Sequence, residues 1–378
     1  MASSRQDSAG TAKSSWLLRS VPGTMAEGRQ MERERLLSAR MASQLLSAPA
    51  RSTLEAAGHL MAAQSQDFIA GRYALAQRVD PMPSRAQVDQ LFNDCLLVRS
   101  WTMRGTLHCC LPQDAQWLVQ LAKERTLRSA AARHRELQID PAAIEQAARI
   151  IHSYLAEAGA ASRTAIFEQL EQQGIGTRNQ RGTHLLLALV LHGLICLGPI
   201  PEGAKLAAQD FVLAEQWISK HHVPDSPMQE LLLRYLGSHA PATLRDAAWY
   251  AGQTLTTIRA AAAELGRELV SVGKNERGED FFVVQGSAAH QACESSGAPQ
   301  LPTRLLGPFD EYYLSWADRS LVADESMQKQ ITPGKNGMFN AFWLEQGRAR
   351  GLWNANIAPT DALGAALHQR YIDFRTTA

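Results

Sequence analysis

The chain has 378 residues, too many for one compact unit, and its apolar content is sufficient for real hydrophobic cores. Its formal net charge of +1 does not by itself indicate a nucleic-acid-binding protein. The longest apolar run, residues 185–200, is interrupted by His192, Gly193 and Gly198, so we do not expect it to span a membrane. No signal-peptide core precedes it.

The charges are distributed unevenly along the chain. Residues 70–135 contain 10 Lys and Arg against 5 Asp and Glu, whereas residues 136–378 contain 20 against 26. A local excess of positive charge is what phosphate binding requires. Arginines also decorate any solvated surface, so charge alone leaves DNA binding as one interpretation among others.

The cysteines do not form a metal-binding pattern. The five are Cys95, Cys109, Cys110, Cys196 and Cys293, and no C-x-x-C pair occurs among them. We therefore predict reduced, mostly structural thiols, as in a cytoplasmic protein, and expect neither a metal site nor a cofactor.

Residues 1–28 are rich in Ser, Gly and Ala, have no apolar period, and are predicted to form a disordered extension. A transit peptide and a misassigned start, with Met25 or Met31 as the true first residue, are alternatives. Helical patterning begins near Glu32, and a second helix is predicted over Thr53–Ala63.

After these helices the chain repeats one theme three times: helix, turn, helix, then a two-stranded ribbon. The last helix before each ribbon is predicted to start near residues 85, 178 and 255. The predicted ribbons pair Leu96–Thr102 with Thr106–Leu111, Leu194–Gly198 with Gln209–Ala214, and Leu269–Gly273 with Asp280–Val284. This order is typical of winged-helix units.

The predicted fold class is therefore α+β, mostly helical, with three tandem winged-helix units at residues 29–135, 136–220 and 221–285. Residues 286–300 are predicted to be a linker, and residues 301–378 a β-rich C-terminal subdomain. Within the latter, FWLEQGRARGLW (342–353) is a predicted hairpin, and residues 358–378 a closing helix.

One candidate site is the string MAAQSQDF (61–68), which contains two carboxamides one residue apart, Gln64 and Gln66. Taken alone, such a pair most often belongs to a solvated surface. Here it follows an apolar helix end, and the two amides can converge on one water only if the backbone leaves the helix at that point. Asp67 either takes part in chemistry or caps the next helix.

The second candidate is VRSWTMRGTLH (98–108), a predicted hairpin with its turn at Gly105. On the first strand, alternation places Arg99, Trp101 and Met103 on one face. Arg99 and Arg104 are candidates for phosphate contacts. Trp101 is either a core anchor or a DNA-stacking residue, and His108 either a DNA contact or a structural histidine.

Two further groups of basic residues are candidates for phosphate contacts. Arg72 and Arg78 lie between the two candidate strings. Arg319 follows Asp318 in the aromatic string LLGPFDEYYLSWADRS (305–320), where it is either a structural bridge or a phosphate contact.

Four strings resemble those of the AlkZ/YcaQ-type winged-helix DNA glycosylases: MAAQSQDFIAGRYALAQR, NDCLLVRSWTMRGTLHCCLPQDAQWL, SHAPATLRDAAWYAG and LLGPFDEYYLSWADRSLV. They follow the family's order between Met61 and Val322, within a resemblance that extends over about residues 32–357. There are two departures: Ser65 replaces the usual apolar residue between the glutamines, and LLGPFD replaces LLPPFD.

The resemblance implies a C-shaped arrangement of tandem winged helices, with Gln64 and Gln66 serving the hydrolytic step. It implies a monofunctional, metal-independent DNA glycosylase acting on alkylated, bulky or crosslinked purines in double-stranded DNA. We expect a monomer with no membrane partner, cytoplasmic and associated with the bacterial nucleoid when bound to DNA. A non-catalytic winged-helix regulator and a protein-interaction scaffold remain alternatives.

Overall fold

The computed structural model describes residues 25–203, 205–295, 300–334, 337–357, 359 and 362–376. Residues 1–24 of the predicted extension at 1–28 lie outside the described residues. Residues 25–28, however, belong to helix α1 (Met25–Ser43), so helical structure begins earlier than the sequence pattern indicated. The described residues are mostly helical and form three antiparallel sheets, which confirms the predicted α+β class.

The elements after α1 carry both candidate strings. They are α2 (Thr53–Leu60), β1 (Ala63–Gln64), α3 (Phe68–Ala76), α4 (Arg85–Asn93), β2 (Val98–Trp101), the 3-10 turn η1 (Met103–Gly105), β3 (Leu107–Cys110) and α5 (Pro112–Glu136). The predicted hairpin is present, and its turn also uses Arg104, which has a φ of 57°. The 25-residue helix α5 was not predicted, because its apolar positions follow no strong period.

The segment predicted as the second unit continues the same sheet. Its elements are α6 (Pro141–Ala158), β4 (Ala160–Ala161), α7 (Arg163–Gln172), α8 (Arg181–Leu191), β5 (Ile195–Leu197), β6 (Phe211–Leu213) and α9 (Ala214–Trp217). The six strands are ordered β1-β3-β2-β5-β6-β4, and β2 meets β5 where Arg99 pairs with Leu197. The ribbons of the first two predicted units therefore form one sheet.

The segment predicted as the third unit matches its sequence pattern closely. Its elements are α10 (Pro227–His239), α11 (Leu244–Ala251), α12 (Leu255–Leu265), the 3-10 turn η2 (Gly266–Glu268), β7 (Leu269–Lys274) and β8 (Asp280–Val284). Thr243 and Asp246 form a reciprocal capping box at the start of α11. Gly252 ends that helix in the left-handed conformation, which a glycine adopts without strain.

The last part of the chain differs from its prediction in two ways. Its elements are α13 (Ala288–Glu294), β9 (Arg304–Leu306), α14 (Glu311–Leu314), α15 (Glu325–Ile331), β10 (Phe342–Glu345), β11 (Arg348–Leu352) and α16 (Ala362–Thr376). The predicted linker at 286–300 contains α13, which packs on α1 and β8 and is capped by Ser287. The predicted β-rich subdomain has more residues in helices than in strands, because only the 342–353 hairpin and β9 form a sheet.

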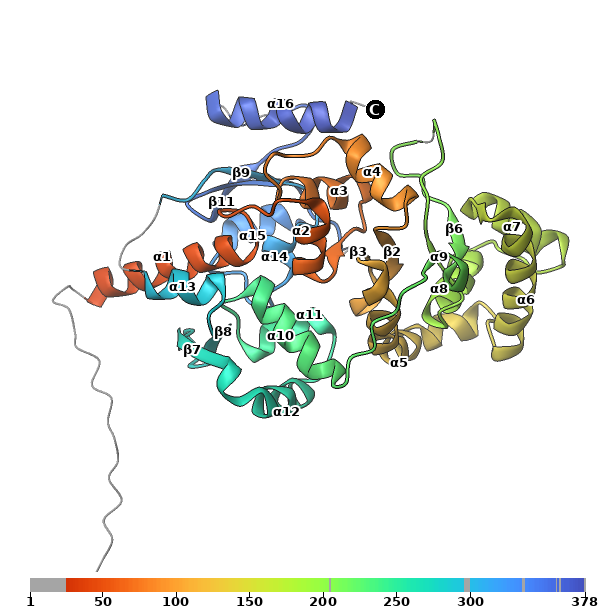
Figure 1. Ribbon diagram of the computed structural model, residues 1–378, viewed down its shortest axis with the longest axis horizontal. Helices are drawn as coiled ribbons and strands as arrows, with labels where there is room; N and C mark the ends of the chain where they lie inside the picture. Colours follow the sequence, from red (N-terminus) through yellow and green to blue (C-terminus); the bar gives the residue numbers. More distant parts are fainter. Residues whose placement is uncertain are drawn as a thin grey trace, which may run out of the picture.

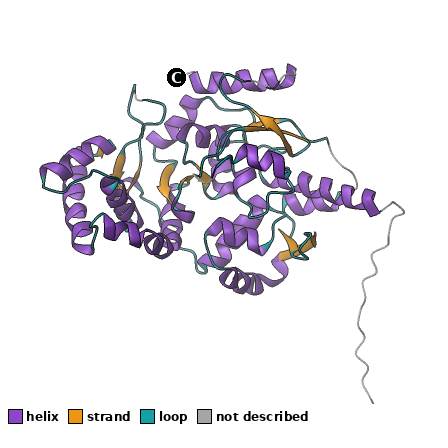
Figure 2. Cartoon of the chain, turned by 180° about the vertical axis from the view of Figure 1, so that it is seen from behind, coloured by secondary structure: helices purple, strands orange, loops and turns teal. Residues whose placement is uncertain are grey.

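The largest hydrophobic core joins segments that are far apart in sequence. It includes Leu37 of α1, Leu118 of α5, Leu236 of α10, Trp316 and Leu344 of β10. A second core lies among α6, α7, α8 and their strands. Figure 1 and the reverse view in Figure 2 place α6 and α7 at one end of the molecule and α1 toward the other. In the part of the chain that the structure describes, no helix is both long and apolar enough to span a bilayer.

Candidate functional site

The two candidate strings meet in the structure. Strand β1 pairs with β3, so that Gln64 lies opposite His108. The Gln64 Nε2 donates to Thr106 Oγ1 at 3.3 Å, and the backbone N–H of Leu107 donates to Gln66 Oε1 at 3.3 Å. The two carboxamides therefore contact adjacent residues, Gln64 the last residue before β3 and Gln66 the first residue of that strand.

The backbone leaves helical geometry at the glutamines, as their convergence requires. Gln64 ends a short strand, and Ser65 N donates to Leu107 O at 2.8 Å. Alternate residues of an extended segment point to the same side, unlike residues two apart on a helix. Asp67 caps α3 by accepting from Ala70 N at 3.0 Å, which confirms the capping alternative. Gln64 is buried, whereas Gln66 is exposed to solvent.

Arg99 fixes the segment that carries the glutamines. Its Nε and Nη2 both donate to Ser65 O, at 2.9 and 2.6 Å, and its guanidinium lies 4.7 Å from the centroid of the Phe68 ring. Burial lowers the pKa of Arg99 to about 10, so it stays charged at neutral pH. Since Arg99 is only 7% exposed, its role in this structure is to position the glutamine segment.

Glu311 is a part of the site that sequence reasoning missed. Its Oε1 accepts the backbone N–H of Gln64 at 2.5 Å, and its Oε2 accepts from Ser315 Oγ and lies 3.5 Å from His239 Nε2. Burial would raise the pKa of this carboxyl, but the contacts with His239, the nearby His108 and Ser315 lower it to about 2. The buried carboxylate therefore anchors the strand end at Gln64. Nothing in the string PFDEYY distinguishes it from a surface acid.

His108 is a buried structural histidine. It has no exposed surface, and its Nδ1 lies 2.8 Å from Thr102 Oγ1 and 3.0 Å from Thr106 O. Burial lowers its pKa to about 4, with a further lowering from Arg104, so the ring is neutral at neutral pH. The predicted contact with DNA does not fit this placement, whereas the structural alternative does.

The neutral state of His108 predicts acid sensitivity of the fold. Folding lowers the pKa of His108 from about 6.5 to about 4. Below pH 6.5 the unfolded chain therefore binds a proton that the folded protein does not, and the free energy of unfolding falls as the pH falls toward 4. In urea unfolding, His108→Gln should reduce the stability difference between pH 7 and pH 4.5 by about 2 kcal/mol relative to the wild type. The control is the exposed His221→Gln. An unchanged pH dependence in His108→Gln would contradict the assigned state.

Gly71 provides the space that Ser65 occupies. A methyl group added at Gly71 would lie 2.8 Å from the Cβ of Ser65 and 2.9 Å from its Cα, and Ser65 is fully buried. The small residue between the glutamines therefore packs directly against α3.

We predict that Gly71→Ala lowers the free energy of unfolding by about 1–2 kcal/mol, because the overpacking outweighs the gain in helix propensity. It should also displace both glutamines, because Ser65 lies between them in the chain. Gly237 is the control, because it lies within α10 and has nothing within 4 Å of an added methyl group. Gly237→Ala should be neutral or stabilising, and a neutral Gly71→Ala would show that the segment tolerates displacement.

Arg72 and Arg78 are not placed for the predicted phosphate contacts. Both side chains have no exposed surface. Arg72 donates to Asp89 and to the carbonyl of Leu206, and Arg78 forms a two-pronged ion pair with Asp310 at 2.7 and 3.0 Å. Buried charges require such partners, so both arginines stabilise the fold here.

The other three predicted DNA contacts are more accessible. Trp101 is half-buried and stacks on Phe211 at 6.5 Å, which fits the core-anchor alternative. Arg104 donates to Tyr250 O and lies 5.9 Å from the ring of Trp249. Arg319 donates to Tyr313 O at 3.0 Å and lies 5.7 Å from the same tryptophan ring. The structure therefore brings Arg104 and Arg319 to one surface, apart from Arg72 and Arg78.

Among the residues that the structure describes, no group of three or more His, Cys, Asp or Glu side chains is placed to bind a metal ion. The groups that the structure gathers around the glutamines include the hydroxyl of Thr106, the carboxylate of Glu311 and the guanidinium of Arg99. These groups can orient water and dipoles at the exposed amide of Gln66.

Comparisons with known proteins identify the family of the chain. A family model described as "DNA glycosylase AlkZ-like" matches residues 57–362, and enzymes of this class cleave the bond between a base and its sugar. The chain belongs to the AlkZ-like DNA glycosylase family, which confirms the resemblance seen in the sequence.

Two similar proteins come from Streptomyces sahachiroi. An interstrand DNA cross-link repair glycosylase is 26% identical over 316 residues, which are 80% of this chain and 82% of that protein. The solved structure of the DNA glycosylase AlkZ matches 90% of this chain and 96% of its own, with 20% identity and a TM-score of 0.73. The structural likeness supports the common fold.

Proposed function

We propose that this DNA repair enzyme hydrolyses the N-glycosidic bond of N7-alkylated purines, including bulky and crosslinked ones, with Gln64 and Gln66 orienting the attacking water. The observation that carries the proposal is the convergence of both carboxamides on Thr106 and Leu107, with Gln66 exposed and Gln64 anchored. The name of the Streptomyces sahachiroi relative, an interstrand DNA cross-link repair glycosylase, supports the inclusion of crosslinked purines among the substrates.

The chemistry suits uncharged side chains. Hydrolysis develops oxocarbenium character on the sugar while water attacks C1′. An N7-alkylated purine is already cationic, so it leaves without a strong general acid. Carbonyl dipoles of the two glutamines can bind the water and stabilise the positive sugar, but an amide is a poor base. Neutral lesions should therefore react poorly.

No Schiff-base step is proposed. Neither MAAQSQDF (61–68) nor VRSWTMRGTLH (98–108) contains a lysine, and a lyase reaction would need an amine nucleophile. The proposed enzyme is therefore monofunctional and leaves an abasic site.

The proposed DNA partner is an alkylated duplex bound by a monomer. The three successive helix–helix–ribbon segments support a tandem winged-helix arrangement with a concave DNA-binding surface. The alternative is a winged-helix regulator that binds DNA without cleaving it. A regulator has no need of an anchored glutamine pair, so base release separates the two functions.

The test is base release from oligonucleotides carrying N7-methylguanine or a guanine crosslink, with EDTA present throughout. From N7-methylguanine we expect free base and an intact, abasic strand. From the crosslink we expect separated strands, one abasic and the other carrying the adduct until its own glycosidic bond is cleaved. Tight binding without release would favour the regulator, and release abolished by EDTA would contradict a metal-independent reaction.

A further inference from the structure

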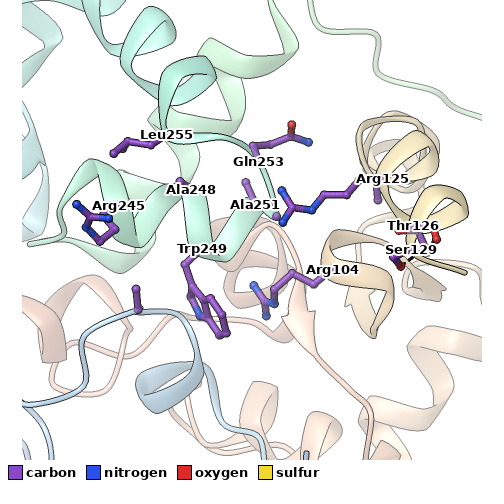
Figure 3. Close-up of a pocket in the computed structure, with 13 residues that line it drawn as sticks. Arg104, Arg125, Thr126, Ser129, Arg245, Ala248, Trp249, Ala251, Gln253 and Leu255 are labelled. Carbon is purple, nitrogen blue, oxygen red and sulfur yellow. Dashed lines mark hydrogen bonds between the residues drawn. The ribbon is translucent and has the colours of Figure 1, made fainter.

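A cavity of about 440 Å³ lies among η1, α5, α11 and the start of α12, outside the glutamine pair itself. Its lining includes three arginines, Arg104, Arg125 and Arg245, and the ring of Trp249. No Asp or Glu is among the residues that line it. Figure 3 shows Arg104 and Arg125 extending from two different elements toward the same space beside Trp249. A positive cavity without a carboxylate suits an anion.

Trp249 is an oriented and accessible ring. Its side chain is among the large hydrophobic groups exposed to solvent, with 45% of the residue accessible. The indole Nε1 donates to Leu314 O at 3.0 Å, which fixes the plane of the ring. Arg104 and Arg319 lie 5.9 and 5.7 Å from its centroid. A fixed, exposed indole with two cations near it can receive a nucleobase at little entropic cost.

The three lining arginines differ in whether the guanidinium already has a hydrogen-bond or ion-pair partner. Arg245 donates to Glu279 at 2.7 Å, and Arg104 donates to Tyr250 O. Arg125 is exposed and has no hydrogen-bond or ion-pair partner among the residues that the structure describes. Among the lining arginines, Arg125 is therefore the cation most available to a phosphate, and Arg104 lies 5.9 Å from the centroid of the indole ring.

The cavity and the glutamine pair share the turn at the end of the hairpin. Arg104 lies in η1, two residues before Thr106, whose hydroxyl accepts from Gln64. Thr126, another lining residue, packs so closely on the turn that a methyl group at Gly105 would lie 2.9 Å from it. A DNA strand lying along the turn would thus contact both the cavity and the exposed carboxamide of Gln66.

We infer that this cavity is a second nucleotide subsite, in which an unpaired nucleobase stacks on Trp249 while its backbone phosphate is bound by Arg125 and Arg104. The subsite rests on the proposed action on DNA and adds to it a place for a base displaced from the helix, distinct from the base that is cleaved. A packing role for Trp249 alone would need neither its exposure nor the free cation at Arg125.

The stacking half of the subsite is tested with two duplexes of equal length, one fully paired and one with a single unpaired adenine. The wild type should bind the bulged duplex more tightly. Trp249→Ala should weaken binding to the bulged duplex by about 10- to 100-fold and change binding to the paired duplex by less than about 2-fold. Trp249→Phe should keep most of the preference, because a phenyl ring also stacks. Melting temperatures of both variants report their folding.

The phosphate half is tested by a matched pair on one helix. Arg125→Ala should weaken binding to both duplexes and reduce the salt dependence of binding by about 0.9 in the log–log slope, one phosphate contact. Arg128→Ala removes the same charge from α5 at a residue that pairs with Glu124 outside the cavity, so it should change neither quantity appreciably.

The outcomes separate this subsite from the proposed reaction. If the wild type releases N7-methylguanine but Trp249→Ala and Arg125→Ala bind both duplexes as it does, the subsite is wrong and the reaction stands. If the bulge preference is lost in Trp249→Ala while no duplex yields free base, the subsite stands and the proposed reaction is wrong. A loss of preference that Trp249→Phe fails to restore would also overturn the stacking role.

Discussion

Gln66→Ala is expected to lower the single-turnover rate of N7-methylguanine release by about 100- to 1,000-fold, the size of effect seen when one oriented dipole is removed from an active site. Gln66 is exposed, and its Oε1 accepts only from Leu107 N at 3.3 Å among the described contacts. Removal of this side chain should therefore leave the fold unchanged. The dissociation constant for DNA should change by less than about 3-fold.

Gln64→Ala should lose activity to a similar extent, with a lower melting temperature as well. Gln64 is buried, and its side chain accepts from Ser65 N and donates to Thr106, so the variant also loosens the segment. The control is Gln172→Ala, an exposed glutamine at the end of α7. Full activity in both Gln64→Ala and Gln66→Ala would remove the proposed mechanism.

The second large effect concerns stability. Asp310→Ala is expected to lower the free energy of unfolding by about 3–5 kcal/mol, because it leaves the fully buried guanidinium of Arg78 without its carboxylate. Asp310 also caps α14 by accepting from Tyr312 N at 2.9 Å. The next residue, Glu311, anchors Gln64, so activity should fall together with stability.

Urea unfolding measures this effect, and an exposed ion pair is the control. Arg149 Nη1 lies 2.8 Å from Glu145 Oε1, but both side chains are mostly exposed. Glu145→Ala should therefore lower the free energy of unfolding by less than about 1 kcal/mol. A loss below 1 kcal/mol for Asp310→Ala would mean that water or another group compensates Arg78. It would also contradict the structural role assigned to that arginine.

Local patterns predicted most of the secondary structure. The hairpin predicted over residues 96–111 pairs Val98–Trp101 with Leu107–Cys110, and helix α12 starts at Leu255, as predicted. The two amides can converge only where the backbone leaves the helix, and it does so at Gln64, but their contacts with the hairpin, 42 and 41 residues away, were not predicted. The hairpin and the helix bounds are local features, because they depend on residues close together in the sequence.

The contacts that position the site could not be predicted. Glu311 reaches the backbone of Gln64 across 247 residues, and Arg78 pairs with Asp310 across 232. A charge count treats every arginine as solvated, so it assigned Arg72 and Arg78 to phosphate although both are buried. Trp249, in contrast, was present in the string RDAAWYAG, but no sequence period indicates that its ring is exposed.

The most direct test of the central claim compares two duplexes that differ in the charge of one base. Single-turnover release is measured from matched oligonucleotides carrying cationic N7-methylguanine or neutral hypoxanthine, at saturating enzyme. If two amides suffice because the leaving base is already positive, N7-methylguanine is released and hypoxanthine is not released above its spontaneous rate. Comparable release of both bases would require a group that protonates the leaving base, and would contradict the account.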